Sequence, residues 1–117
     1  MKIKTGTKRQ MSLGDYSIDC YLLNDGSKTI GLHSLDKITR QIDYRLDIGY
    51  NTVTASEINY SCPVTKVLQN ESDIILVIDL KDFSRIIFQE SMRTKDASLI
   101  AIVSALVETG IEKIRGR

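Results

Sequence analysis

Residues 14–32 read GDYSIDCYLLNDGSKTIGL, and this stretch decides how the N-terminal part of the chain folds. A shift of one position in strand pairing turns every side chain to the other face of a sheet, so the apolar positions determine the register. A three-residue loop at positions 24–26 gathers the apolar side chains on one face and gives Gly26 the loop position that requires a positive φ. The predicted pairs are Ile18 with Leu32, Cys20 with Ile30 and Leu22 with Lys28. The stretch therefore predicts a β-hairpin.

The same reasoning adds one strand before the hairpin. Gly14 and Asp15 are typical of a two-residue turn. The pairs that follow from this turn are Met11 with Ile18 and Leu13 with Tyr16. We therefore predict a three-stranded antiparallel meander. Its buried face would consist of Met11, Leu13, Ile18, Cys20, Leu22, Ile30 and Leu32.

The opposite face of this meander is more polar. It carries Asp19, Ser27 and Thr29, and its large apolar groups are Tyr21 and Leu23. Such a face stays in contact with water unless another element covers it. We expect the chain's own helices to cover the two apolar side chains.

A helix is predicted after the hairpin, with Ser34 as its N-cap and Gly49 as its end. Its apolar positions recur at helical spacing and are Leu35, Ile38, Ile42, Leu46 and Ile48. Residues 50–68 show a poorer pattern and contain the chain's one proline, Pro63. This segment predicts one or two short strands joined by loops.

The apolar run IILVI at residues 74–78 is rich in β-branched side chains and predicts a buried strand. Asp79 follows the strand and is typical of a helix N-cap. The inward residues of the helix it begins would be Leu80, Phe83, Ile86 and Ile87. Asp79 and Asp82 could also form a carboxylate pair, but capping is the simpler interpretation.

A last helix is predicted from near Asp96 to Gly110, a typical C-terminal glycine. Its apolar residues spread over most of the helix surface, and the polar ones are Ser98, Ser104, Glu108 and Thr109. A helix without a polar face is either central in its domain or packed against another chain. We therefore expect a homo-oligomer that associates through residues 97–114.

The composition indicates one α+β domain over residues 1–117, in which the meander packs with about three helices. Hydrophobic residues make up 42% and charged residues 26%, as in ordinary globular proteins. No apolar run is long enough to span a bilayer, and no secretory signal is present. We expect a cytoplasmic protein, located in the host cytoplasm if a phage encodes it, with no membrane partner.

The residues give little support to an enzyme. No glycine-rich phosphate loop is present, and His33 is the one histidine, with no partner that the sequence identifies. Cys20 and Cys62 are far apart and lack the spacing of a metal site, so two buried thiols are the simpler interpretation. We predict no catalytic residues, no metal and no cofactor.

Nucleic-acid binding has somewhat better support. The formal charge is +1, from 16 basic and 15 acidic residues, so any such binding must depend on local patches. The candidate contacts to nucleic acid or to a nucleotide ligand are Lys8, Arg9, Lys37, Arg40 and Tyr44. Aspartates lie between the basic residues of the first helix, so an ordinary solvated helix face is an equal alternative.

Residues 12–38 read SLGDYSIDCYLLNDGSKTIGLHSLDKI. They contain, in order, a Gly-Asp turn, a strand with the pattern I-x-C-x-x-L-x-D-G and a following helix. The stretch is similar to the opening of regulatory proteins carried by phages and plasmids. More loosely, it resembles the N-terminal modules of phage antirepressors of the Bro-N and KilA-N kind. The stretch LIAIVSALVETGIEKI is similar to a helix in the same proteins. The resemblance implies a mobile-element origin and DNA binding.

Two functional hypotheses follow. The first is a small, antirepressor-like regulatory protein of a phage or mobile element that binds nucleic acid. The alternative is a homo-oligomeric phage counter-defence protein that binds a host protein or sequesters a signalling nucleotide. In the alternative, basic and aromatic residues would meet in a pocket between subunits.

Overall fold

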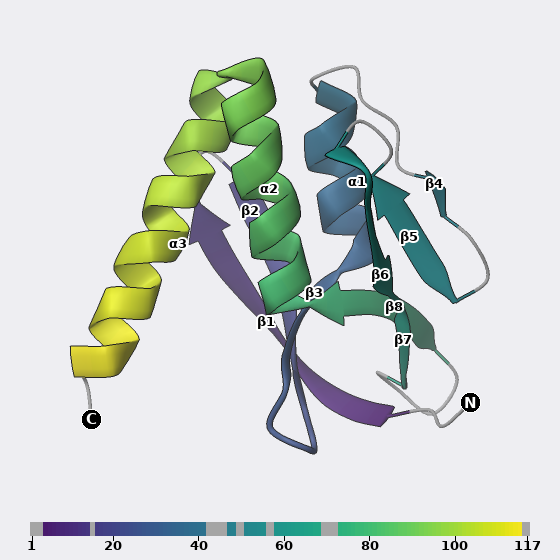
Figure 1. The fold of residues 1–117 in the computed structure, drawn as a ribbon. Coiled ribbons are helices and arrows are strands. Elements are labelled where there is room, and N and C mark those ends of the chain that lie inside the picture. Colours follow the sequence, from purple (N-terminus) through teal and green to yellow (C-terminus); the bar gives the residue numbers. More distant parts are fainter. Residues whose placement is uncertain are drawn as a thin grey trace.

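A computed structural model describes residues 4–14, 16–41, 47–48, 51–55, 58–68 and 73–115. The fold is α+β, with the helices packed against the strands (Figure 1). The strands are β1 (Lys4–Leu13), β2 (Tyr16–Leu23), β3 (Lys28–Gly31), β4 (Asp47–Ile48), β5 (Thr52–Ala55), β6 (Tyr60–Pro63), β7 (Thr65–Leu68) and β8 (Ile74–Asp79). The helices are α1 (Leu32–Gln41), α2 (Leu80–Thr94) and α3 (Ala97–Arg115).

The first three strands belong to a closed barrel with the order β1-β2-β3-β8-β7. They are therefore not a separate meander, because β7 and β8 complete the sheet around them. The registers at the two turns agree with the sequence interpretation, and Gly26 has a φ of 88°. Observed pairs include Met11 with Ile18, Leu13 with Tyr16, Cys20 with Ile30 and Leu22 with Lys28. The closing pair, β1 with β7, is parallel.

Closure of the barrel corrects the expectation for the face of β2 that carries Tyr21 and Leu23. This face is neither exposed to solvent nor covered by helices. Tyr21, Leu23, Val67 and Val77 are buried together and form a small core of their own. Because Tyr21 and Leu23 come from β2 and the two valines come from β7 and β8, strands rather than helices cover this face. Thr29 is also buried and donates its hydroxyl hydrogen bond to the Tyr21 carbonyl, at 2.9 Å.

The main core lies between the outer face of the barrel and the three helices. Residues 58–64 and the strand β5 also contribute to it. The main-core residues at zero or near-zero exposure include Leu13, Ile18, Ile30, Leu35, Ile38, Val53, Phe83, Ile86, Ile87, Leu99 and Ile102. Leu22, expected in this core, is 38% exposed. Figure 1 shows that the turn of the β2–β3 hairpin extends beyond the helices.

The helix α1 begins earlier and ends earlier than its sequence pattern predicts. It starts at Leu32, so Leu32 does not continue the sheet opposite Ile18, and Ser34 lies inside the helix rather than capping it. Ser34 instead accepts a hydrogen bond from the Asp19 backbone N–H at 3.2 Å. Of the predicted C-terminal positions, Ile48 lies in β4, while 42–46 fall outside the described residues.

The segment predicted to hold one or two strands holds three. The strands β4, β5 and β6 form a second, antiparallel sheet, and β7 then enters the barrel. Pro63 is the last residue of β6, where its missing N–H costs the ladder little. Cys62 is buried, Cys20 is half-buried, and the two do not form a disulfide.

The helix α2 begins at the cap that the sequence predicts, and α3 begins next to Asp96, where its start is predicted. Asp79 accepts a hydrogen bond from the Lys81 N–H at 2.8 Å, and Asp96 accepts one from the Ser98 N–H at 2.9 Å. The helix α3 does not end at Gly110 but continues to Arg115, since no left-handed residue interrupts it there. Among the described residues, no helix combines the length and apolar character needed to cross a lipid bilayer.

Candidate functional site

A cluster of polar side chains surrounds Asp19 where β2 passes the start of α1. The His33 Nε2 atom lies 2.7 Å from the Asp19 Oδ2 atom. The Lys8 Nζ atom lies 3.8 Å from the same oxygen, and the Gln10 side chain reaches the Oδ1 atom at 3.5 Å. The Asp19 carboxylate therefore gathers groups from β1 and from the first turn of α1.

Strand alternation explains why these groups meet. In the β1–β2 register, Gln10 lies opposite Asp19 and Lys8 lies opposite Tyr21, so all four side chains share one face of the sheet. His33 is the second residue of α1, and the short path from β3 into the helix brings it back over that face. The cluster thus depends on the same register that places the apolar core.

Gly31 provides the space for the His33 ring. A β-carbon at position 31 would lie 2.7 Å from the His33 Cε1 atom and 2.9 Å from its Nδ1 atom. These distances are shorter than any real contact of this type, so a side chain at position 31 and the observed ring position exclude one another.

The His33 contact helps to lower the pKa of Asp19 and decides which ring nitrogen of His33 faces the carboxylate. Partial burial acts to raise the pKa of Asp19, but the hydrogen bonds from His33 and Gln10 and the positive charge of Lys8 outweigh it and hold that pKa below its usual value. Because the carboxylate only accepts hydrogen bonds, the His33 Nε2 atom carries the proton. In the neutral imidazole, the Nδ1 atom is then an acceptor.

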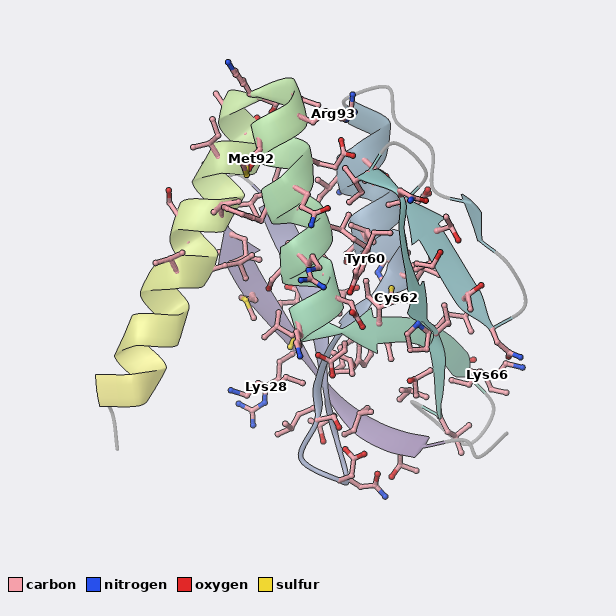
Figure 2. The ribbon with its side chains drawn as sticks, in the orientation of Figure 1. Lys28, Tyr60, Cys62, Lys66, Met92 and Arg93 are labelled. Atoms are coloured by element: carbon pink, nitrogen blue, oxygen red, sulfur yellow. The ribbon has the colours of Figure 1, made fainter. Side chains whose placement is uncertain are left out.

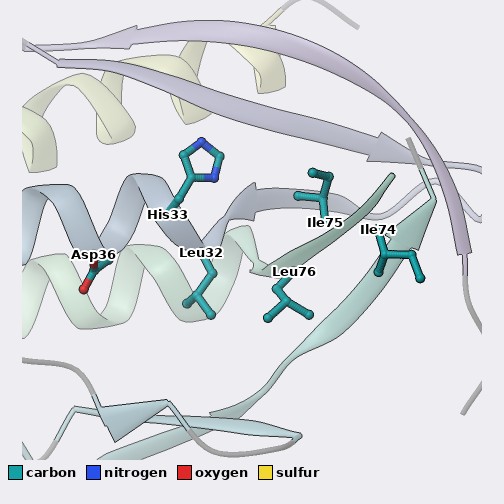
Figure 3. Close-up of a pocket in the computed structure, with 6 residues that line it drawn as sticks. All are labelled: Leu32, His33, Asp36, Ile74, Ile75 and Leu76. Carbon is teal, nitrogen blue, oxygen red and sulfur yellow. The ribbon is translucent and has the colours of Figure 1, made fainter. Parts of the chain in front are cut away.

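A pocket of about 340 Å³ lies beside this cluster, between α1 and β8. It is lined by Leu32, His33, Asp36, Ile74, Ile75 and Leu76. Figure 3 shows one His33 ring nitrogen directed toward β1 and β2 and the other toward the Ile75 side of the pocket. The volume of the pocket is at the lower end of the range for small-molecule sites.

The structure separates the predicted binding residues. Lys8 is exposed beside Asp19, and Lys37 is exposed one helical turn after His33. Arg9 is exposed on the other face of β1, because neighbouring strand residues alternate. Arg40 belongs to α1, but its side chain lies outside the described part of the chain, as does the whole of Tyr44.

Sequence reasoning missed Asp19 and the apolar pocket wall. Asp19 is 14 positions from His33, and only the hairpin register, which places it on the face opposite the main core, could have marked it. Ile74 and Leu76 were expected in a buried strand, but they are 51% and 37% exposed. That expectation was wrong because β8 lies in the barrel wall, and the first residues of this strand are not covered by another element of the described chain.

A second polar cluster connects the β4–β5–β6 sheet to α2. The Tyr60 hydroxyl donates to the Asp82 carboxylate at 2.5 Å, and the Arg85 guanidinium lies 5.4 Å from the centre of the Tyr60 ring. Asp82 therefore has a tyrosine partner, while Asp79 caps the helix, so the two do not act as a carboxylate pair. Figure 2 shows Tyr60 and Cys62 between β6 and α2. Within the described residues, no three acidic, histidine or cysteine side chains are grouped to hold a metal ion.

No family model, curated protein or solved structure matches this chain. The geometry around Asp19 and the adjacent pocket therefore carries the functional argument. It provides two lysines on an exposed surface, an oriented imidazole and a small apolar pocket.

Proposed function

We propose that this chain is a small regulatory protein of a phage or mobile element that binds nucleic acid through the surface formed by β1 and α1. The observation that carries the proposal is that Lys8 and Lys37 are both exposed close to His33, one on β1 and one on α1. Lys8 and His33 contact the same Asp19 oxygen, and Lys37 lies one turn further along the exposed side of α1. Two exposed lysines on one surface can each contact a phosphate of a nucleic-acid strand.

The electrostatics support local rather than global attraction. The formal charge of +1 gives the molecule no strong overall field. Asp19 offsets part of the charge of Lys8, at a distance of 3.8 Å. We therefore expect weak binding that depends on few phosphate contacts and declines as salt concentration rises.

The test is the affinity of the protein for labelled single-stranded and duplex oligonucleotides, measured by fluorescence anisotropy over a series of salt concentrations. We expect Lys8→Ala and Lys37→Ala each to weaken binding and to reduce the salt slope by about 0.7 to 0.9. Lys81→Ala is the matched control, because Lys81 is an exposed lysine on α2. Absence of binding at low salt, or equal losses for all three variants, contradicts the proposal.

A second candidate function is favoured by the surface of α2 and α3. Apolar side chains are exposed on both helices, with Phe88 at 50%, Met92 at 63%, Ile100 at 48% and Val107 at 56% exposure. Exposed apolar groups of this size on neighbouring helices are typical of protein interfaces. They support the counter-defence alternative, in which copies of the chain associate through residues 97–114 and bind a host protein or a signalling nucleotide. The pocket beside His33 lies within one chain, so this alternative does not require a pocket between subunits.

The oligomeric state tests this candidate. We expect native mass spectrometry to find an oligomer that Ile100→Glu dissociates, because a charge at a buried interface is not paired. Lys81→Glu is the control, since it also changes charge on an exposed helix position. A monomer at the concentrations used for binding rules the candidate out, and a retained nucleotide in the native spectrum supports it over the first proposal.

A further inference from the structure

Four exposed residues of α2 form one row along the helix. Lys81, Arg85, Phe88 and Met92 are spaced by four, three and four residues, so they lie within about 40° of one another around the helix axis and extend over about 16 Å. We call this row the α2 ridge. The opposite side of α2 is buried and consists of Phe83, Ile86, Ile87, Glu90 and Ser91.

The C-terminal half of the α2 ridge is apolar, although a surface helix normally carries polar residues on its outer side. Phe88 is 50% exposed and Met92 is 63% exposed. Neither side chain belongs to the main core, because both lie on the side of α2 away from its buried residues. Aromatic residues and methionine are enriched in protein interfaces, where covering them removes apolar surface from water. This half of the ridge therefore favours an apolar partner surface.

The N-terminal half of the α2 ridge is cationic. Within the described residues, neither Lys81 nor Arg85 forms an ion pair with a carboxylate. The Arg85 guanidinium lies 5.4 Å from the centre of the Tyr60 ring, and the Tyr60 hydroxyl is hydrogen-bonded to Asp82. Because this contact already restrains the guanidinium, Arg85 loses less conformational freedom when it binds a carboxylate. This half of the ridge therefore favours an acidic partner surface.

A second copy of the chain does not supply that acidic surface from the same face. Among the described side chains of α2 and α3, the acidic ones are Asp82 and Glu90. Asp82 is hydrogen-bonded within its own chain, and Glu90 is fully buried. Two copies that meet through these helices therefore have no described carboxylate to place against Lys81 and Arg85.

We propose that the α2 ridge binds an amphipathic helix of another protein, whose contacting face carries acidic residues in one half and apolar residues in the other. Two helices packed lengthwise meet once per turn, which matches the spacing of the ridge. Phe88 and Met92 anchor the partner, and the two cations fix its direction along α2. The inference goes beyond both proposed functions, since it requires neither nucleic-acid binding by β1 and α1 nor an oligomer formed through α3.

The test uses designed alanine-based helical peptides labelled with fluorescein, and fluorescence anisotropy measures their binding to the intact protein. One acidic peptide carries two glutamates one turn apart, followed by two leucines at the spacing of Phe88 and Met92. A second acidic peptide has the same residues in reverse order, and lysines replace the glutamates in the matched basic peptides. We expect one acidic peptide to bind about tenfold more tightly than its basic counterpart, with an affinity that declines as salt concentration rises.

Variants show whether the α2 ridge is the site, and circular dichroism confirms that each is folded. Arg85→Glu should weaken binding of the acidic peptide about tenfold and strengthen binding of the basic peptide, because attraction and repulsion are exchanged. Phe88→Ala should weaken binding of both peptides, since each contains the leucines. Lys37→Glu is the matched control, because it makes the same charge change at an exposed position of α1, outside the ridge. It should leave the affinity for the peptides unchanged.

Three results overturn the proposal. The first is no binding of either acidic peptide at low salt. The second is an equal loss of peptide binding in Arg85→Glu and Lys37→Glu, which means that the peptide is attracted by charge alone. The third is an oligomer that Phe88→Ala dissociates in native mass spectrometry, which means that a second copy occupies the ridge. The oligonucleotide titrations are measured separately, so failure of this inference is distinguishable from failure of the nucleic-acid function.

Discussion

Gly31 controls the position of His33, because the ring occupies the space that a side chain at position 31 would fill. The nearest ring atom would be 2.7 Å from a β-carbon there, and Tyr21 approaches to 3.3 Å from the other side. The exposed imidazole is the more mobile of these two neighbours, since Tyr21 is buried in the barrel. A residue with no role in binding therefore sets the geometry of the Asp19 cluster.

We predict that Gly31→Ala separates His33 from Asp19. Without the histidine hydrogen bond, burial is less opposed and the pKa of Asp19 rises toward its usual value of 3.8, which NMR titration of the carboxyl carbon measures. A lowered pKa stabilises the folded state above pH 3.8, and this contribution is lost as pH falls through the folded-state value. The variant should therefore be less stable than the wild type at pH 7, and the difference should narrow below pH 3.8.

His33→Ala is the comparison for this prediction, because it removes the same hydrogen bond without adding a β-carbon. Both variants should give a similar pKa for Asp19. If Gly31→Ala leaves that pKa at the wild-type value, the ring has another position from which it still reaches Asp19, and the argument from the missing β-carbon is wrong.

At the scale of elements, the sequence was informative where local chemistry determines structure. The caps Asp79 and Asp96, the turn glycine Gly26 and the hairpin registers were all predictable, because each depends on residues close in the sequence. The β1–β7 pairing was not, because it joins Lys4 to Val67 and no local pattern reports so distant a contact. For the same reason, the sequence predicts that helices cover Tyr21 and Leu23 on β2, whereas strands cover them in the structure.

The candidate site was predictable only in part. Lys8 and Lys37 were chosen for charge, and both are exposed near His33. Arg9 was chosen with them, but strand alternation places it on the other face. The pocket could not be foreseen, since it forms where the start of α1 meets β8, and these elements are about 40 residues apart in the sequence. Sites of this kind follow from the packing of elements and not from a motif.

The whole molecule has two cores joined through one sheet, and the smaller β4–β5–β6 sheet is attached to the main core. Val53 and Cys62 lie opposite one another in this sheet, and both are buried against the helices. The Tyr60 hydrogen bond to Asp82 joins the same sheet to the first turn of α2. Substitutions in the β4–β5–β6 sheet should therefore change the free energy of unfolding according to how closely this sheet packs against α2.

We predict that stability declines between pH 9 and about 11 through Cys62. Burial, and secondarily the negative charge of Asp82, raises the pKa of the Cys62 thiol from 9.0 to about 11. A raised pKa gives full stability below pH 9, and the contribution is lost as the pH rises to the folded-state value, because the unfolded chain ionises first. The loss should be on the order of 2 kcal/mol of unfolding free energy, measured by urea denaturation across this range.

Two variants separate this effect from the ionisation of other groups. Cys62→Ala should lower stability at pH 7 but should flatten the decline above pH 9, because the titrating thiol is gone. Val53→Ala removes buried volume from the opposite strand position without removing a titratable group, so it should keep the wild-type slope. If the Cys62→Ala slope equals that of the wild type, the thiol ionises equally in both states, and the second sheet is packed less closely against α2 than its buried residues indicate.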